Sequence, residues 1–176
     1  MIMILKPQDI VMLLKLAVEP KTKWSYNQLA YELHMSSSEI HKGIKRATQA
    51  RLFDSHHKQP RRKALEEFLV HGVKYAYPPD IGTMTRGIPT AFASPMLRNE
   101  VVHGGSGSEV YVWPHPEGDV RGLELSPLYK SVPNAARFDE KLYAALGLLD
   151  AIRIGRARER HLAEALLLEM LSDAAK

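Results

Sequence analysis

The 176-residue chain contains no cysteine, and that absence excludes several classes of protein. Disulfide scaffolds, thiolate zinc sites, iron–sulfur clusters and cysteine nucleophiles all need the thiol. Long apolar runs are also lacking, since no stretch approaches the roughly 20 residues that cross a bilayer as a helix. The first residues, Met1 to Leu5, have neither a basic region nor a small-residue cleavage site. We therefore expect a soluble cytoplasmic protein without a signal peptide.

The remaining composition is that of an ordinary globular protein. Hydrophobic residues make up 45% of the chain and charged residues 25%. A chain of this length buries roughly two-thirds of its unfolded surface, so it needs neither a disulfide nor a metal to fold. We expect one domain, or a small domain with an appendage, and no cofactor.

Positive charge is concentrated in the first half of the chain. Residues 1–77 contain 13 Lys and Arg against 7 Asp and Glu, whereas residues 78–176 contain 11 against 13. Within residues 21–63 the basic residues number 10 and the acidic residues 3. A basic half of this kind indicates a polyanionic partner, most simply nucleic acid. The alternative interpretation is a lysine-rich solvated surface.

Proline and glycine divide the chain into three segments. Eight of the 11 prolines and seven of the 11 glycines fall within residues 78–133. That stretch also contains aromatic and aliphatic residues such as Trp113, so we expect it to pack, with short strands. The predicted segments are a DNA-binding domain over 1–77, a Pro/Gly-rich extension over 78–134 and C-terminal helices over 135–176.

Apolar spacing and capping residues predict the helices of the first segment. Pro7 suits a first helical turn, and apolar residues follow it at three- and four-residue intervals until Pro20. Ser25 is the expected N-cap of a second helix. Ser36 and Glu39 have the form of a capping box, which opens a third helix running to about residue 50. A strand is expected at residues 52–53 and a fourth helix from about residue 62.

The segment from Ser25 to Phe53 has a specific order of small and apolar residues, which are Leu29, Ala30, Leu33, Met35, Ser36, Ile40, Ile44, Leu52 and Phe53. With this order, residues 7–77 resemble the DNA-binding domain of bacterial winged helix-turn-helix transcriptional regulators, of the MarR-like kind. Many members have glycine where this chain has His34 and Arg51, and histidine tolerates the left-handed backbone better than most residues. No apolar alternating second strand follows residues 55–63, so we expect the wing to be a short basic loop; the alternative is a disordered surface loop.

The resemblance implies that the third helix enters the major groove of double-stranded DNA. If Ile40 and Ile44 point inward, the opposite face carries Ser38, Lys42, Lys45 and Gln49, flanked by His41 and Arg46. These side chains suit phosphate and base-edge contacts. The predicted DNA-binding residues are Ser37, Ser38, His41, Lys42, Lys45, Arg46, Gln49, Lys58, Arg61 and Arg62. The alternative is an ordinary amphipathic helix with a lysine-rich surface.

Other clusters give weaker signals. Thr85, Arg86 and Thr90 fall in a predicted loop that suits an anion or a small effector, or that packs the extension across the helices. The glycine-rich residues 104–108 indicate a flexible connection rather than a phosphate site. The histidines, His103 among them, lack metal-ligand spacing, so we expect no metal site. Arginines at 153, 156 and 160 share a predicted helix face, where ion pairs are favoured over a second phosphate-contact surface.

The C-terminal segment predicts a helical hairpin broken at Gly155, with Phe138 on the inward face of its first helix. The second helix is apolar around most of its circumference near residues 162–171, which indicates a dimer interface. The sequence as a whole predicts a mainly α fold and a homodimeric, sequence-specific DNA-binding transcriptional regulator. An antitoxin-like protein with a protein partner is the first alternative. An enzyme is the second, although no complete catalytic set is present.

Overall fold

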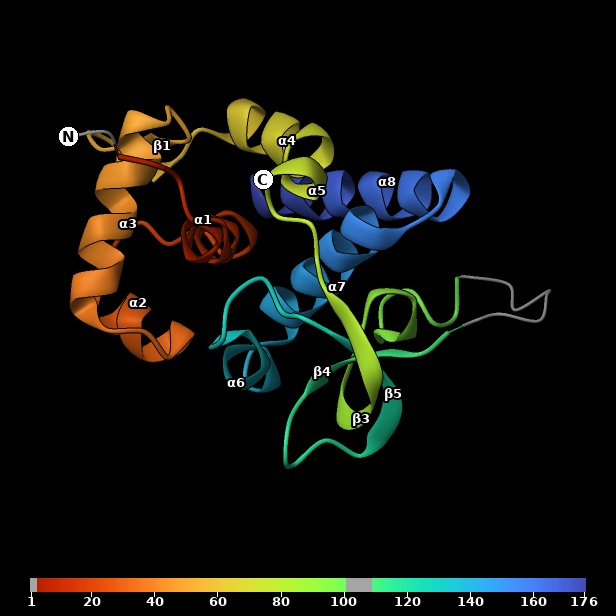
Figure 1. The fold of residues 1–176 in the computed structure, drawn as a ribbon. Coiled ribbons are helices and arrows are strands. Elements are labelled where there is room, and N and C mark those ends of the chain that lie inside the picture. The colour runs from red at the N-terminus through yellow and green to blue at the C-terminus, as the bar shows by residue number, and fades with distance from the viewer. Residues whose placement is uncertain (1–2, 101–108) are drawn as a thin grey trace.

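The computed structural model describes residues 3–100 and 109–176. These residues form eight α-helices, one 3-10 helix and five strands in two small sheets (Figure 1). Helices predominate, as the sequence predicts, but the fold is mixed and contains more β-structure than expected. The predicted glycine-rich connection 104–108 and His103 lie outside the described residues.

The first segment forms α1 (Pro7–Val18), α2 (Tyr26–Leu33), α3 (Ser37–Gln49), β1 (Phe53–Asp54), β2 (Gln59–Pro60), α4 (Arg62–His71) and α5 (Val73–Ala76). The order of α1 to α4 and β1 is as predicted, whereas β2 and α5 were not expected. Two predicted caps are confirmed. The Ser25 hydroxyl accepts a hydrogen bond from the Gln28 N–H at 3.1 Å, and Ser36 and Glu39 form the reciprocal capping box. Such caps satisfy backbone N–H groups that have no partner within the first turn. The starts of α2 and α3 therefore follow from local sequence.

Two turns place non-glycine residues in left-handed backbone. His34, after α2, has φ 53°, and Arg51, after α3, has φ 61°. The His34 N–H donates hydrogen bonds to carbonyl oxygens of the last turn of α2. The helix therefore ends without an unsatisfied backbone donor at this turn. These are the positions where the resemblance leads one to expect glycine, and the backbone takes the glycine-like conformation at both.

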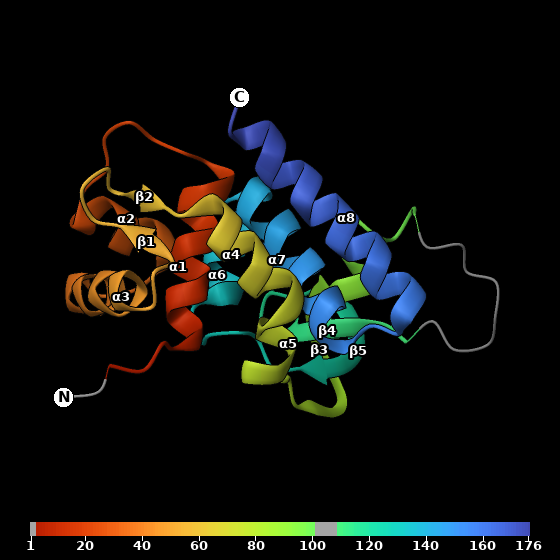
Figure 2. The ribbon, with the colours of Figure 1, turned by 90° about the horizontal axis from the view of Figure 1, so that it is seen from above.

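Helix α1 is the central element of this region and is buried from Asp9 to Val18. Helices α3, α7 and α8 all pack against it. Figure 2 shows α1 between α3 on one side and α4 and α7 on the other. Helix α3 therefore lies at the outer edge of the molecule, with α1 between it and α4 and α7.

The segment after α3 forms a small hairpin. Strands β1 and β2 pair antiparallel, with Phe53 opposite Pro60 and Asp54 opposite Gln59. The exposed residues 55–58 join them. The segment expected to form a basic loop is therefore a short two-stranded hairpin.

The Pro/Gly-rich extension is more regular than predicted. It contains β3 (Ile81–Thr90), the 3-10 helix η1 (Ala91–Ala93), β4 (Tyr111–Pro114) and β5 (Val120–Leu125). Strand β3 runs antiparallel to both β4 and β5, which pair parallel to each other, so the three strands close into a ring. At Gly87, where β3 passes from β5 to β4, an added Cβ would lie 2.0 Å from the Trp113 carbonyl oxygen. Glycine is therefore required for the strands to close.

The last segment forms α6 (Val132–Arg137), α7 (Glu140–Ile154) and α8 (Ala157–Ala174). Helices α7 and α8 make the predicted hairpin. The prediction that Phe138 faces inward is wrong. Asp139 caps α7, which leaves Phe138 between two helices with 77% of its surface exposed.

The apolar side chains of α8, expected to need an external partner, are largely covered within the chain. Ala163, Leu167 and Leu171 are buried. Most of the other apolar side chains of α8 pack half-buried against the same core, and Leu168 is 36% exposed. Helices α7 and α1 supply this cover within one chain, so the apolar circumference is not evidence for a dimer interface on α8.

One hydrophobic core connects the three predicted segments. It includes Leu14 of α1, Trp113 of β4 and Leu149 of α7, each at most 1% exposed. Among the described residues, no helix combines the length and hydropathy needed to cross a membrane.

Candidate nucleic-acid interface

The outer face of α3 is polar and basic. Its exposed side chains are Ser38, His41, Lys42, Lys45 and Gln49. At 100° per residue these five fall within about 60° of Ser38. Ile40, Ile44 and Ala47 point inward and are 0–6% exposed. The predicted orientation of the helix is therefore confirmed, and no carboxylate of α3 belongs to the exposed face.

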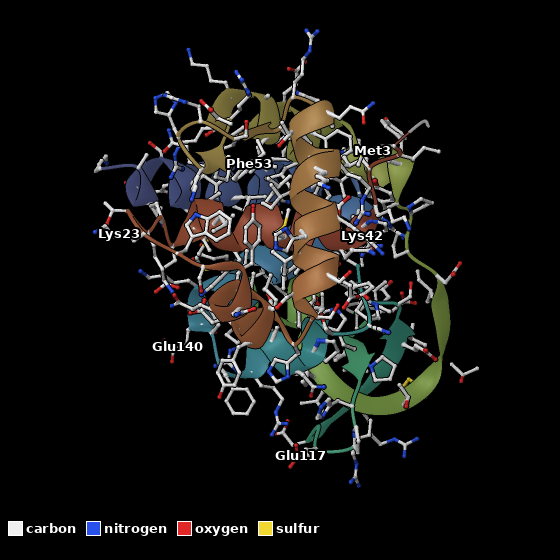
Figure 3. All side chains as sticks on the ribbon, turned by 90° about the vertical axis from the view of Figure 1, so that its left-hand side faces the viewer. Met3, Lys23, Lys42, Phe53, Glu117 and Glu140 are labelled. Carbon is white, nitrogen blue, oxygen red and sulfur yellow. The ribbon has the colours of Figure 1, made fainter. Side chains whose placement is uncertain are left out.

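Figure 3 views this face directly. Helix α3 stands in front of the other elements, with Lys42 on the side of the β3–β5 sheet and Phe53 of the hairpin on the other side. A ligand approaching along this direction meets α3 first.

The expectation that Arg46 flanks the exposed face is wrong. Its guanidinium is buried and makes two hydrogen bonds to the Asp9 carboxylate of α1, each 2.7 Å long. The hydrogen bonds to Asp9 raise the pKa of Arg46, so its charge is permanent. Arg46 is about 80° from Ser38 around the helix, at the edge that meets α1. Its role is to join α1 to α3.

A second feature of the α1–α3 contact was missed from the sequence. Gly43 lies where an added Cβ would be 2.9 Å from the Asp9 carboxylate and 3.2 Å from the Met12 sulfur. The small residue lets α3 approach α1 closely enough for the ion pair to form. A glycine inside a predicted helix is a signal of close packing, and it was available in the sequence.

Helix α2 orients two of the predicted residues. The His41 ring stacks on Tyr26 with 3.8 Å between ring centroids. The Ser37 hydroxyl donates a hydrogen bond of 2.6 Å to the Asn27 side chain. His41 is held at the edge of the exposed face, while Ser37 is engaged in joining α2 to α3.

The hairpin loop is organised by Asp54. Its carboxylate accepts hydrogen bonds from the backbone N–H groups of His56 and His57 and from the His57 ring. The hydrogen bond with the His57 ring is the main cause that lowers the pKa of Asp54 to about 2. Lys58 and Arg61 are exposed on this hairpin, as expected. The Trp24 indole donates a hydrogen bond of 3.0 Å to the Lys58 carbonyl oxygen, which ties the loop to the segment before α2.

Arg62 does not extend this basic surface. Its guanidinium donates hydrogen bonds to the Leu171 carbonyl oxygen of α8 at 2.8 Å and to the Ala17 carbonyl oxygen of α1 at 3.2 Å. The side chain therefore points into the body of the molecule. Arg62 was expected to contact DNA, but the structure engages its guanidinium with internal carbonyl groups.

The N-terminal end of α3 is contacted by the extension. The Tyr129 hydroxyl donates a hydrogen bond to the Glu39 carboxylate, whose other oxygen accepts from the Ser36 N–H at 2.7 Å. The bond from Tyr129 is the largest cause that lowers the pKa of Glu39, followed by the Ser36 N–H. The carboxylate nearest the exposed face is thus fully engaged. This contact was not foreseen.

A buried lysine links α3's supporting helices to the C-terminal segment. The Lys15 ammonium of α1 lies 2.5 Å from a Glu19 oxygen, 3.3 Å from Glu32 of α2 and 2.6 Å from Asp139, the cap of α7. Burial lowers the pKa of Lys15, but hydrogen bonds to Asp139 and Glu19 outweigh it and raise the pKa. The helices around α3 are therefore fixed to α7 by charge as well as by apolar packing.

The predicted effector loop is a strand. Thr85, Arg86 and Thr90 lie on β3, and Thr90 is fully buried with its hydroxyl 2.6 Å from the Asp150 carboxylate. Burial raises the pKa of Asp150, and the nearby Arg153 charge opposes that effect. Three cavities found among the described residues lie elsewhere, and Arg86 lines none of the three. The expectation of a loop is wrong, because Gly82, Gly87 and Pro89 lie within a strand that pairs with β4 and β5.

Two of the three arginines predicted to share a helix face, Arg153 and Arg160, form ion pairs as expected. Arg153 contacts the Asp150 carboxylate at 2.8 Å, and Arg160 lies 3.6 Å from Glu164. Arg158 is exposed. The basic face of α3 is therefore the stronger candidate for a polyanion.

No family model, curated protein or solved structure matches this chain.

Proposed function

We propose that this protein binds double-stranded DNA in a sequence-specific manner and acts as a transcriptional regulator. The observation that carries the proposal is the outer face of α3. All five of its exposed side chains are cationic or polar, and its one nearby carboxylate is engaged by Tyr129 and Ser36. Such a face can approach a polyanion without like-charge repulsion.

In this proposal residues 7–77 act as a winged helix-turn-helix, with α3 as the recognition helix. Lys42 and Lys45 contact phosphates or guanine, and Ser38 and Gln49 make hydrogen bonds to base edges in the major groove. In this arrangement, Lys58 and Arg61 of the hairpin region lie along the phosphate backbone of the DNA beside the groove. Support comes from the short left-handed turn between α2 and α3 and from the position of α3 at the edge of the molecule.

The test begins with selection of bound sequences from a pool of random duplex DNA. Affinity for the selected site is then measured by fluorescence anisotropy over a range of salt concentrations. Lys42→Ala/Lys45→Ala should weaken binding to all sequences and reduce the salt-dependence slope by about 2, because two phosphate contacts are lost. Gln49→Ala should weaken binding to the preferred site by about 1–3 kcal/mol. It should also reduce discrimination between bases at one position of the site, without changing the salt-dependence slope.

Arg158→Ala is the matched control, since Arg158 is an exposed cation on α8. We expect it to bind as the parent does. If the lysine double variant binds normally and Arg158→Ala does not, α3 is not the contact surface and the proposal fails.

Action as a homodimer is part of the proposal, because one helix-turn-helix buries too little surface to specify a long site. Two aromatic side chains beside one groove favour that groove over α8 as the dimer surface. Tyr31 is 85% exposed and Phe138 is 77% exposed. The groove has a volume of about 860 Å³, and lysines and carboxylates both line it, so two identical copies can meet without net repulsion.

Light scattering tests where the dimer interface lies. It is measured for the parent, for Tyr31→Ser/Phe138→Ser and for Leu168→Ser. We expect a parent dimer that the aromatic double variant dissociates and that Leu168→Ser leaves intact. A monomeric parent, alone and on a two-half-site duplex, would contradict the homodimer.

A further inference from the structure

The segment between β5 and α6, residues 126–131, reaches back to the N-terminal end of α3. Tyr129 contacts Glu39 across a separation of 90 residues in the chain. The neighbouring side chain, Lys130, is exposed, and its ammonium lies 5.8 Å from the Tyr129 ring centroid. The extension therefore carries a cation to the helix that is the proposed reading element.

The side of α3 on which this cation lies can be worked out from helical geometry. Glu39 is about 100° from Ser38 around α3, and Lys42 is about 40° from Ser38 on the same side. The Lys130 ammonium lies 5.8 Å from the centroid of the Tyr129 ring, and the Tyr129 hydroxyl contacts Glu39, so the ammonium lies near this edge. Figure 3 agrees, since Lys42 and the β3–β5 sheet lie on the same side of α3.

The two ends of α3 are thus flanked by different basic elements. The hairpin with Lys58 and Arg61 follows the C-terminal end, and the segment with Lys130 lies at the N-terminal end (Figures 1 and 3). A helix lying in a major groove has one phosphate backbone on each side. Figure 3 shows Phe53 of the hairpin and Lys42 on opposite sides of α3, so cations beside these two sides can contact different strands.

We propose that Tyr129 and Lys130 form a third DNA-contacting element, in which Lys130 binds a backbone phosphate and Tyr129 holds it in position through Glu39. Lys130 is the contact and Tyr129 is a positioning residue. This inference rests on the proposed function, because it needs α3 to read DNA.

The contact is tested with Lys130→Ala and a labelled duplex that carries the selected site. Losing one phosphate contact should reduce the salt-dependence slope by about 0.9, which corresponds to about fivefold weaker binding near 0.15 M salt. The loss should be equal on a scrambled duplex, because a phosphate contact does not read sequence. Lys130→Arg should restore the slope. Lys176→Ala, an exposed lysine beyond α8, should have no effect.

The positioning role is tested by a double-mutant cycle with Tyr129→Phe, which keeps the ring and removes only the hydroxyl. In the Tyr129→Phe background, Lys130→Ala should weaken binding by less than twofold, because the lysine is no longer held beside the groove. Thermal melting of Tyr129→Phe tests that the fold persists. Independent effects of the two substitutions would overturn the positioning role.

Failure of this inference and failure of the proposed function give different results. If Lys42→Ala/Lys45→Ala impairs binding and Lys130→Ala behaves as Lys176→Ala does, DNA binding stands and the third element is refuted. If the parent binds no duplex at all, the proposed function fails and this inference fails with it.

Discussion

Replacement of Arg46 by alanine tests whether this arginine stabilises the fold or contacts DNA. The guanidinium makes two hydrogen bonds of 2.7 Å to the Asp9 carboxylate, and both side chains are at least 90% buried. Removing one member of such a pair leaves the other charge buried without compensation, at a cost of about 3–5 kcal/mol. The Lys6 N–H remains bonded to Asp9, so part of the carboxylate stays satisfied and the lower half of that range is expected.

The cost is large on the scale of a domain whose free energy of unfolding is about 5–15 kcal/mol. With a urea m-value of about 2 kcal/mol/M, the midpoint should fall by roughly 1.5–2 M. Circular dichroism follows the helices, and Trp24, whose ring centroid lies 6.3 Å from that of Phe53 in β1, gives a fluorescence signal. Lys45→Ala, one residue away and exposed, is the control and should change the midpoint very little.

DNA affinity completes the experiment. Below the unfolding transition, folded Arg46→Ala should keep the parent's salt-dependence slope, because no phosphate contact is lost. A variant that keeps its stability within about 1 kcal/mol while the slope falls by about 1 would refute the reasoning. Arg46 would then be a contact residue, as the sequence alone predicted.

Three further predictions concern other contacts of the structure. Gly43→Ala should lower stability by about 1–3 kcal/mol in a thermal melt, because its Cβ would lie 2.9 Å from the Asp9 carboxylate, whereas in an open helix alanine would stabilise by about 1 kcal/mol. His57→Ala should raise the pKa of Asp54 from about 2 toward 3.8 in a carboxyl NMR titration. Because that pKa is depressed by folding, its stabilising effect is full above about pH 4 and is lost as the pH falls toward 2. Arg62→Ala should lower the unfolding midpoint without changing DNA affinity, since both its hydrogen bonds are internal; an unchanged midpoint with weaker DNA binding would contradict this.

Local sequence determined the ends of α2 and α3 and the direction in which α3 faces. A cap forms between residues three apart, as Ser36 and Glu39 do. The face of a helix follows from a period of 3.6 residues. These effects act within one or two turns, so they do not depend on where the rest of the chain lies. The same reasoning identified the break at Gly155 between α7 and α8.

Only the tertiary structure decided which basic side chains are exposed and which are engaged inside the molecule. Arg46 and Lys45 are adjacent in the sequence. Arg46 is buried in an ion pair with Asp9, 37 residues away, whereas Lys45 is exposed. Tyr129 meets Glu39 across 90 residues, and α8 is covered by helices whose positions no local pattern specifies. Composition gives the number of cations in a segment, but their partners are chosen by packing between distant elements. The sequence therefore predicts a basic helix face, and the fold decides which cations of the segment take part in it.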